Sequence, residues 1–252
     1  MVFDFDGVIV DGICEYWWSA RRACQNLLHG KCNSEELPEV VPKPFQLLRP
    51  WVHHGWEMVL IAAELLRPES SLLLHGPITF SNNYDLHCQQ ALQAWGWDAF
   101  ELQQALERVR HEAIHKDRAA WLAKHQSFPG VVRRLKHLKN EGVEWAVLTT
   151  KGVSFTAELL KCFHLSPTLL YGHESGSKTK VLLQLAAERA LKGFIEDRRS
   201  TLETVLATPG LSNLPCYLAK WGYLKPEDLR FVPQGIHLLK LETLSHPLAS
   251  WP

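Results

Sequence analysis

Short apolar runs alternate with amphipathic segments along the second half of the chain, from Gly142 onward. Short apolar runs bounded by turn residues predict buried strands, and apolar residues that recur every three or four positions predict helices. Such strands, alternating with helices of about ten residues, are typical of a parallel α/β sheet. The predicted strands are 2–5, 143–148, 168–171, 193–195 and 216–219, and the predicted helices are 153–163, 178–191 and 199–207.

Residues 12–126 show a different pattern, in which helical periodicity continues and no convincing strand appears. Helices are predicted at 15–29 and 55–66. A third begins near Asp98, which lies three residues before a glutamate, the spacing of an N-cap box. The proline-rich stretch 38–50 predicts a loop between the first two helices.

The tryptophans indicate that this segment is a separate domain. Seven of the ten tryptophans in the chain lie within 12–126, which predicts a hydrophobic core of its own. We therefore predict an α/β fold in which residues 1–11 and 127–252 form a parallel-sheet core. The all-helical domain, 12–126, is inserted after the first strand.

Composition excludes several classes of protein. The chain has 27 basic and 27 acidic residues among 252, so no strong field favours nucleic acid or an anionic membrane. No apolar run approaches the roughly 20 residues that a membrane-spanning helix needs. The chain opens directly into a predicted strand, which leaves no room for a signal peptide, and its six cysteines form no C-x-x-C pair, so we expect reduced thiols. We expect a cytoplasmic protein that is a monomer, with a dimer as the alternative.

The first predicted strand ends in two carboxylates, Asp4 and Asp6, and Gly7 follows directly. Residues i and i+2 of a strand point to the same side, and open α/β sheets bind ligands at the carboxyl ends of their strands. Two close carboxylates need a cation or a shared proton. The pair is therefore a candidate Mg²⁺ site, a nucleophile with an acid/base, or both, although aspartate and glycine are also ordinary turn residues.

Three further polar features follow other predicted strands. Thr149 and Thr150 are hydroxyls at the end of one apolar strand, Lys178 stands just before a helix, and Glu196 and Asp197 follow another strand. Hydroxyl and ammonium groups hold phosphate oxygens, and carboxylates hold divalent cations. Each feature alone also has an ordinary structural role as a turn former, a solvated lysine or a helix cap.

Together and in this order, these features resemble the haloacid dehalogenase superfamily. The segment Phe3-Asp-Phe-Asp-Gly-Val-Ile-Val-Asp11 is similar to its first motif, and the run from Pro129 through Val147-Leu-Thr-Thr-Lys-Gly152 is similar to the region of its second. The resemblance covers roughly residues 1–11 and 128–225. It implies a Rossmann-like parallel sheet, and it implies that 12–126 is a helical cap of the C1 type.

The resemblance also implies a role for each motif residue. Asp4 would be the nucleophile that forms an aspartyl-phosphate. Asp6 would protonate the leaving oxygen and then activate water. Thr149 and Lys178 would hold the transferring phosphoryl oxygens, which stabilises the developing charge.

The implied metal is Mg²⁺. Its ligands would be Asp4, the backbone carbonyl of Asp6, and Asp197, with Glu196 as a direct or water-mediated ligand. The implied function is hydrolysis of a small phosphorylated metabolite. The alternatives are a phosphomutase that uses the same residues, and a binding or regulatory protein that kept the fold without turnover. The intact set of motif residues argues against the last.

The chain departs from the family pattern at two places. The fourth motif often has a second acid about four residues after its aspartate, and Thr201 stands there. The lysine segment is Gly176-Ser-Lys178-Thr-Lys180, without the common prolines, so Lys180 is an alternative phosphate lysine. The dehalogenating branch lacks an aspartate at the position of Asp6, and its presence therefore favours phosphoryl transfer.

Two other motifs suggest rival chemistry. His111 and His115 satisfy H-E-x-x-H, which on a helix places two imidazoles on one face for zinc. No third ligand is evident, and a solvated helix face is the alternative that we favour. The segment Gly172–Thr179 is similar to a nucleotide phosphate loop, but Ser177 replaces its second glycine, which would crowd the approach of a phosphate.

Overall fold

The computed structural model describes residues 1–28 and 37–252. Its contacts divide the chain into two compact units. The α/β unit consists of Met1–Asp11 and Gln126–Pro252, and the helical unit consists of Gly12–His125. Residue 29 of the helix predicted at 15–29, and Cys32 among the cysteines expected to be reduced, lie outside the described residues.

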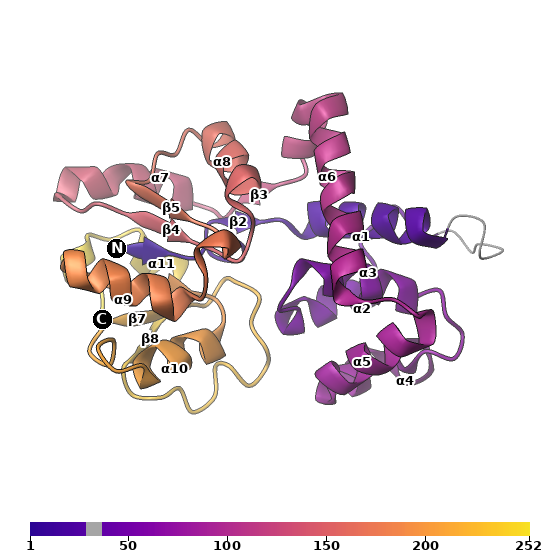
Figure 1. The fold of residues 1–252 in the computed structure, drawn as a ribbon. Helices are drawn as coiled ribbons and strands as arrows, with labels where there is room; N and C mark the ends of the chain where they lie inside the picture. Colours follow the sequence, from indigo (N-terminus) through magenta and orange to yellow (C-terminus); the bar gives the residue numbers. More distant parts are fainter. Residues whose placement is uncertain (29–36) are drawn as a thin grey trace. The chain divides into compact units, whose positions relative to one another are not determined.

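A six-stranded parallel sheet forms the centre of the α/β unit, in the order β5-β4-β1-β6-β7-β8, and it confirms the predicted fold class. Helices flank it (Figure 1). The strands are β1 (Val2–Phe3), β4 (Ala146–Leu148), β5 (Leu169–Tyr171), β6 (Phe194–Glu196), β7 (Cys216–Ala219) and β8 (Ile236–Leu239). The helices are α7 (Val131–Leu138), α8 (Val153–Cys162), α9 (Lys178–Glu188), α10 (Arg199–Ala207) and α11 (Leu241–Leu244).

The first strand lies in the middle of this sheet because it is apolar on both faces. Val2 and Phe3 are buried, and β1 pairs with β4 on one side and with β6 on the other. Strands that are covered on both faces have near-continuous apolar sequences, and this pattern allowed β1 to be predicted. The last strand, β8, was not predicted, because it is an edge strand whose two central side chains are only partly buried or exposed.

A short antiparallel pair accompanies the main sheet. Strand β2 (Val10–Asp11) pairs with β3 (Gln126–Ser127), and the Phe128 N–H donates to the Ile9 carbonyl at 3.1 Å. These strands lie where the chain leaves the α/β unit and where it returns. The pair therefore ties the two ends of the inserted segment to each other.

The helical unit contains α1 (Ile13–Leu28), α2 (Lys43–Leu48), α3 (Gly55–Glu64), α4 (Ser71–Asn82), α5 (Tyr84–Trp95) and α6 (Ala99–Leu122). Trp17 and Trp121 are fully buried in it. Asp98 caps α6 as predicted, since its Oδ1 accepts from the Glu101 N–H at 2.8 Å. No helix among the described residues is long and apolar enough to cross a membrane.

The loop predicted at 38–50 is wrong over much of its length. Helix α2 occupies Lys43–Leu48, and a 3-10 turn follows at Arg49–Trp51. Each of these helices has a proline in its first two positions. The first N–H groups of a helix have no partner within it, so a proline there costs no hydrogen bond. Proline therefore marks helix starts here rather than a loop.

A buried charged network holds the helical unit together. The Arg110 guanidinium donates to both oxygens of Glu15, at 2.8 Å each, and both side chains are buried. The Ser19 hydroxyl and the Trp121 indole N–H also donate to Glu15. Because these bonds satisfy a carboxylate that has lost its hydration, each one depends on the presence of the others.

Removal of one partner of this pair should be costly. We expect Arg110→Met to lower the free energy of unfolding by about 3–5 kcal/mol, because it removes the guanidinium that binds both oxygens of the buried Glu15 carboxylate. The matched control is Arg189→Met, which breaks an exposed pair with Glu144 at 2.8 Å and should cost about 0–1 kcal/mol. Urea unfolding followed by circular dichroism measures both, and equal losses would contradict this account of the network.

Candidate active site

The polar residues that follow the strands meet at one edge of the sheet. Asp4 comes directly after β1, Thr149 directly after β4, and Glu196 and Asp197 at the end of β6. These three strands are neighbours in the order β4-β1-β6, and parallel strands present their carboxyl ends at the same edge. Lys178 is the first residue of α9, which follows β5 beyond a short loop.

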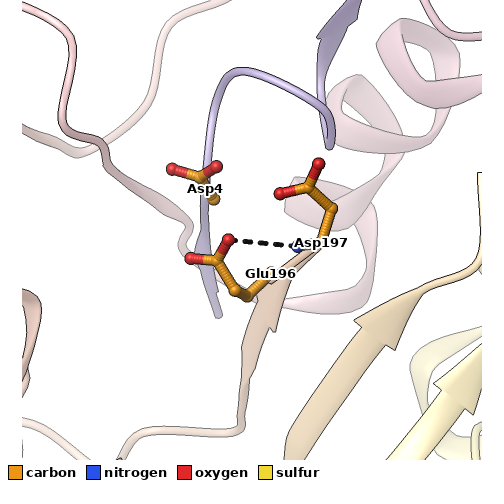
Figure 2. A group of neighbouring side chains, drawn as sticks. All are labelled: Asp4, Glu196 and Asp197. Carbon is orange, nitrogen blue, oxygen red and sulfur yellow. Dashed lines mark hydrogen bonds between the residues drawn. The ribbon is translucent and has the colours of Figure 1, made fainter. Parts of the chain in front are cut away.

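Three carboxylates form a buried cluster there. Asp4, Glu196 and Asp197 each offer an oxygen, and these oxygens lie within 4.8 Å of one another. The three residues are 5%, 2% and 6% exposed. Figure 2 shows them rising from two neighbouring strands into the same space. Among the sequence-predicted metal ligands, the structure thus brings these three side chains together.

One ammonium group partly balances the cluster. The Lys178 Nζ donates to Asp4 Oδ1 at 2.8 Å and to Glu196 Oε2 at 2.5 Å. Burial, and then the Glu196 carboxylate, raise the pKa of Asp4 to about 7 against the opposing effect of Lys178. Burial works to lower the pKa of Lys178, but the Asp4 and Glu196 carboxylates outweigh it and raise that pKa above its ordinary value.

The cluster fits a hard divalent cation. Three carboxylates and one ammonium leave a residual charge of about −2 when all are ionised, which a divalent cation would offset. Carboxylate oxygens are the ligands that Mg²⁺ prefers in proteins. Burial, and then the neighbouring Glu196 carboxylate, disfavour the ionised form of Asp4 and so raise its pKa.

Glu196, the last residue of β6, and Asp197, which follows it, are held by different hydrogen bonds. Glu196 Oε1 accepts from the N–H groups of Asp197 and Arg198 at 3.2 and 3.1 Å, while its other oxygen meets Lys178. Asp197 Oδ2 accepts from the Tyr223 N–H at 2.8 Å. Both oxygens of Glu196 therefore accept hydrogen bonds within the protein.

Asp6 has its own counter-charge, which the sequence did not identify. The Lys151 Nζ lies 3.3 and 3.4 Å from the two carboxylate oxygens of Asp6, and the Lys151 side chain is only 4% exposed. The Lys151 N–H also donates to the Thr149 hydroxyl at 3.1 Å. In the sequence, this role of Lys151 could have been inferred from its position two residues after Thr149, just beyond the end of β4.

The loop after β7 also reaches the site, and no motif predicted it. Tyr223 contacts Asp197 through its backbone and donates its hydroxyl to Asp11 Oδ1 at 2.6 Å. The Trp221 indole N–H donates to the Val8 carbonyl at 3.0 Å. In the sequence, the feature that could have indicated this loop is a glycine between two aromatic residues, Trp221-Gly-Tyr223.

The two rival motifs differ in what the structure shows for them. His111 and His115 are exposed on α6, and the acidic cluster found among the described residues includes neither. In the segment similar to a phosphate loop, Lys178 faces carboxylates, whereas Lys180 is exposed. The contacts of Lys178 favour it over Lys180 as the lysine of the site.

Comparisons with known proteins place the fold. No protein-family model and no curated protein sequence matches the chain. Solved structures do match over nearly the whole length. A structure described as a predicted phosphoglycolate phosphatase from Haemophilus somnus has a TM-score of 0.58 at 17% identity and covers 94% of this chain and 92% of its own.

Two further structures agree with it. A haloacid dehalogenase-like hydrolase from Streptococcus pneumoniae has a TM-score of 0.56 at 16% identity and covers 97% of this chain and 95% of its own. A protein from Thermotoga maritima, provisionally assigned as a β-phosphoglucomutase, has a TM-score of 0.55 at 14% identity with the same coverages, 97% and 95%. The chain therefore has the fold of the haloacid dehalogenase superfamily.

Proposed function

We propose that this protein is a Mg²⁺-dependent phosphatase that hydrolyses a small phosphorylated metabolite through an aspartyl-phosphate. The observation that carries the proposal is the buried cluster of Asp4, Glu196 and Asp197 with Lys178 across it. It combines a nucleophilic carboxylate, ligands for a hard cation and the positively charged side chain of Lys178. These lie at the edge of the sheet where α/β proteins bind ligands. The matching structures that are described as predicted phosphatases support the same activity.

The first step would transfer the phosphoryl group to the protein. An oxygen of Asp4 attacks phosphorus, the bond to the substrate oxygen breaks, and Asp6 gives that oxygen a proton. Lys178, whose Nζ lies 2.8 Å from Asp4 Oδ1, would hold phosphoryl oxygens together with Thr149. Lys151 then stabilises the carboxylate that Asp6 becomes.

The second step would release phosphate. Asp6 takes a proton from water, the water oxygen attacks phosphorus, and the bond to Asp4 breaks, so that inorganic phosphate leaves and both aspartates return to their starting states. The cation, when bound, neutralises charge on the phosphoryl oxygens and favours the ionised form of Asp4. Asp197 and Asp4 would hold it, with Glu196 beside them.

A phosphomutase is the second candidate, because one matching structure carries that provisional assignment. It would use the same residues and return the phosphoryl group to the substrate. The helical unit Gly12–His125 occupies the place in the chain where the superfamily carries its cap, and we propose that role for it. We favour the phosphatase because phosphatases are more frequent than mutases in the superfamily.

Asp4→Asn should reduce turnover to background. An amide cannot attack phosphorus and is a poor ligand for a hard cation, and removal of Mg²⁺ by EDTA should have the same effect in the native chain. The measurement is phosphate release from a panel of phosphorylated metabolites. The control is Asp228→Asn, a largely buried aspartate that accepts from the Lys225 N–H at 2.8 Å and lies outside the cluster. Native turnover in Asp4→Asn would refute the assignment of the nucleophile.

Asp6→Asn should lower kcat by about 10²- to 10⁴-fold and change KM much less, because general acid–base catalysis acts in the transition state. Steady-state kinetics on the best substrate of the panel gives both constants. An unchanged kcat with a raised KM would show that Asp6 only binds substrate.

Labelled solvent separates the phosphatase from the mutase. In ¹⁸O water a phosphatase should release inorganic phosphate that carries one solvent oxygen per turnover, because water attacks the aspartyl-phosphate at phosphorus. Mass spectrometry of the released phosphate makes the measurement. Isomerised substrate with little free phosphate would instead establish the mutase.

A further inference from the structure

The loop that follows β7 connects the Asp197 carboxylate with the turn that follows β1. The Tyr223 N–H donates to Asp197 Oδ2 at 2.8 Å, and the Tyr223 hydroxyl donates to Asp11 Oδ1 at 2.6 Å. Two residues earlier, the Trp221 indole N–H donates to the Val8 carbonyl at 3.0 Å. One short loop thus makes three hydrogen bonds to residues far away in the sequence, and one of these residues is a candidate metal ligand.

Backbone packing around Asp197 is too close for side chains. A Cβ atom at Gly7, whose φ is +89°, would lie 1.9 Å from Asp197 Oδ2. A Cβ atom at Gly222 would lie 2.3 Å from Asp197 Cβ and 2.5 Å from the Gly7 carbonyl oxygen. Both glycines are therefore required by contact with Asp197, which two backbone segments enclose.

The hydrogen bonds of the sheet do not by themselves fix the position of the Tyr223 N–H, which donates to Asp197. The ladder of β7 ends with the bond from the Lys220 N–H to the Leu239 carbonyl, and Tyr223 lies three residues beyond it. The side chain of Tyr223 adds contacts of its own to the backbone hydrogen bonds of its neighbours Gly222 and Leu224. Its hydroxyl binds Asp11, and its ring atom Cδ2 lies 3.0 Å from the position that a Gly7 Cβ would take.

We propose that Tyr223 is a positioning residue for the metal site. Its hydroxyl bond to Asp11 holds the loop in place, and its backbone N–H then fixes the plane of the Asp197 carboxylate. Hydrogen bonds to metal-ligating carboxylates fix their orientation and contribute strongly to metal affinity. The inference rests on the proposed function, because it assumes that Asp197 holds a divalent cation.

The test is the affinity of the purified full chain for Mn²⁺ alone, measured by equilibrium dialysis without substrate. Tyr223→Phe keeps the ring and the backbone N–H but removes the hydroxyl, and we expect its affinity to fall by about 10- to 100-fold. The matched control is Tyr84→Phe. The Tyr84 hydroxyl also donates to a carboxylate, Glu57 Oε2 at 2.8 Å, but this pair belongs to the helical unit. Loss of the Tyr84 hydroxyl should therefore leave the Mn²⁺ affinity unchanged.

Asp11 supplies an independent pair of variants. Asp11→Asn keeps an oxygen that can accept from the Tyr223 hydroxyl and should remain closer to the native affinity than Asp11→Ala. Asp11→Ala should weaken Mn²⁺ binding at least as much as Tyr223→Phe does, and the double variant should lose less affinity than the sum of the two single losses, because both substitutions break the bond between Tyr223 and Asp11.

Turnover gives a second readout. If Tyr223 acts through the cation, Tyr223→Phe should require more Mg²⁺ for half-maximal turnover, while excess Mg²⁺ should restore kcat with substrate KM nearly native. Thermal melting establishes that each variant is folded at the assay temperature. A general structural defect would persist in excess Mg²⁺ and would overturn the inference.

The outcomes separate this inference from the proposed function. Native Mn²⁺ affinity in folded Tyr223→Phe and Asp11→Ala would overturn the positioning role and leave the phosphatase proposal intact. Failure of the native chain to bind Mn²⁺ would overturn both. Weaker binding in these two variants, with native binding in Tyr84→Phe, would support the positioning role.

Discussion

The candidate active site is organised by one electrostatic constraint. Asp4, Glu196 and Asp197 are buried within a few ångströms of one another, and Lys178 supplies one positive charge against three negative ones. Buried like charges are unfavourable, and the raised pKa of Asp4 reflects this. A divalent cation at the cluster would offset the excess charge and leave Asp4 ionised, which is the form in which a carboxylate attacks phosphorus.

The fold produces this constraint by its topology. Residues about 190 positions apart in the sequence become neighbours because β1 is inserted between β4 and β6 in the sheet. Each of these strands contains little more than its apolar run. The polar residue at or just after the end of each strand therefore lies at the carboxyl edge of the sheet. The loop after β7 adds a further layer, since Trp221 and Tyr223 bind the turn after β1 and the carboxylate of Asp197.

Apolar periodicity was enough to predict the sheet, because its central strands are continuous apolar runs between turn residues. It failed where position within the fold mattered more than composition: the partly exposed edge strand β8 was missed, and prolines at helix starts concealed α2. At the site, motif residues were predictable from strand ends, and their roles stay predictions. Lys151 and Tyr223 were not identified, because their significance comes from contacts between distant segments.

The most direct test of the central claim is to trap the phosphoryl group on the protein. With Mg²⁺ and acetyl phosphate, an aspartyl-phosphate can be reduced by borohydride to homoserine and located by peptide mass spectrometry. The account predicts homoserine at position 4 alone, dependent on Mg²⁺. Hydrolysis of acetyl phosphate without modification of Asp4, or with modification at another residue, would contradict it.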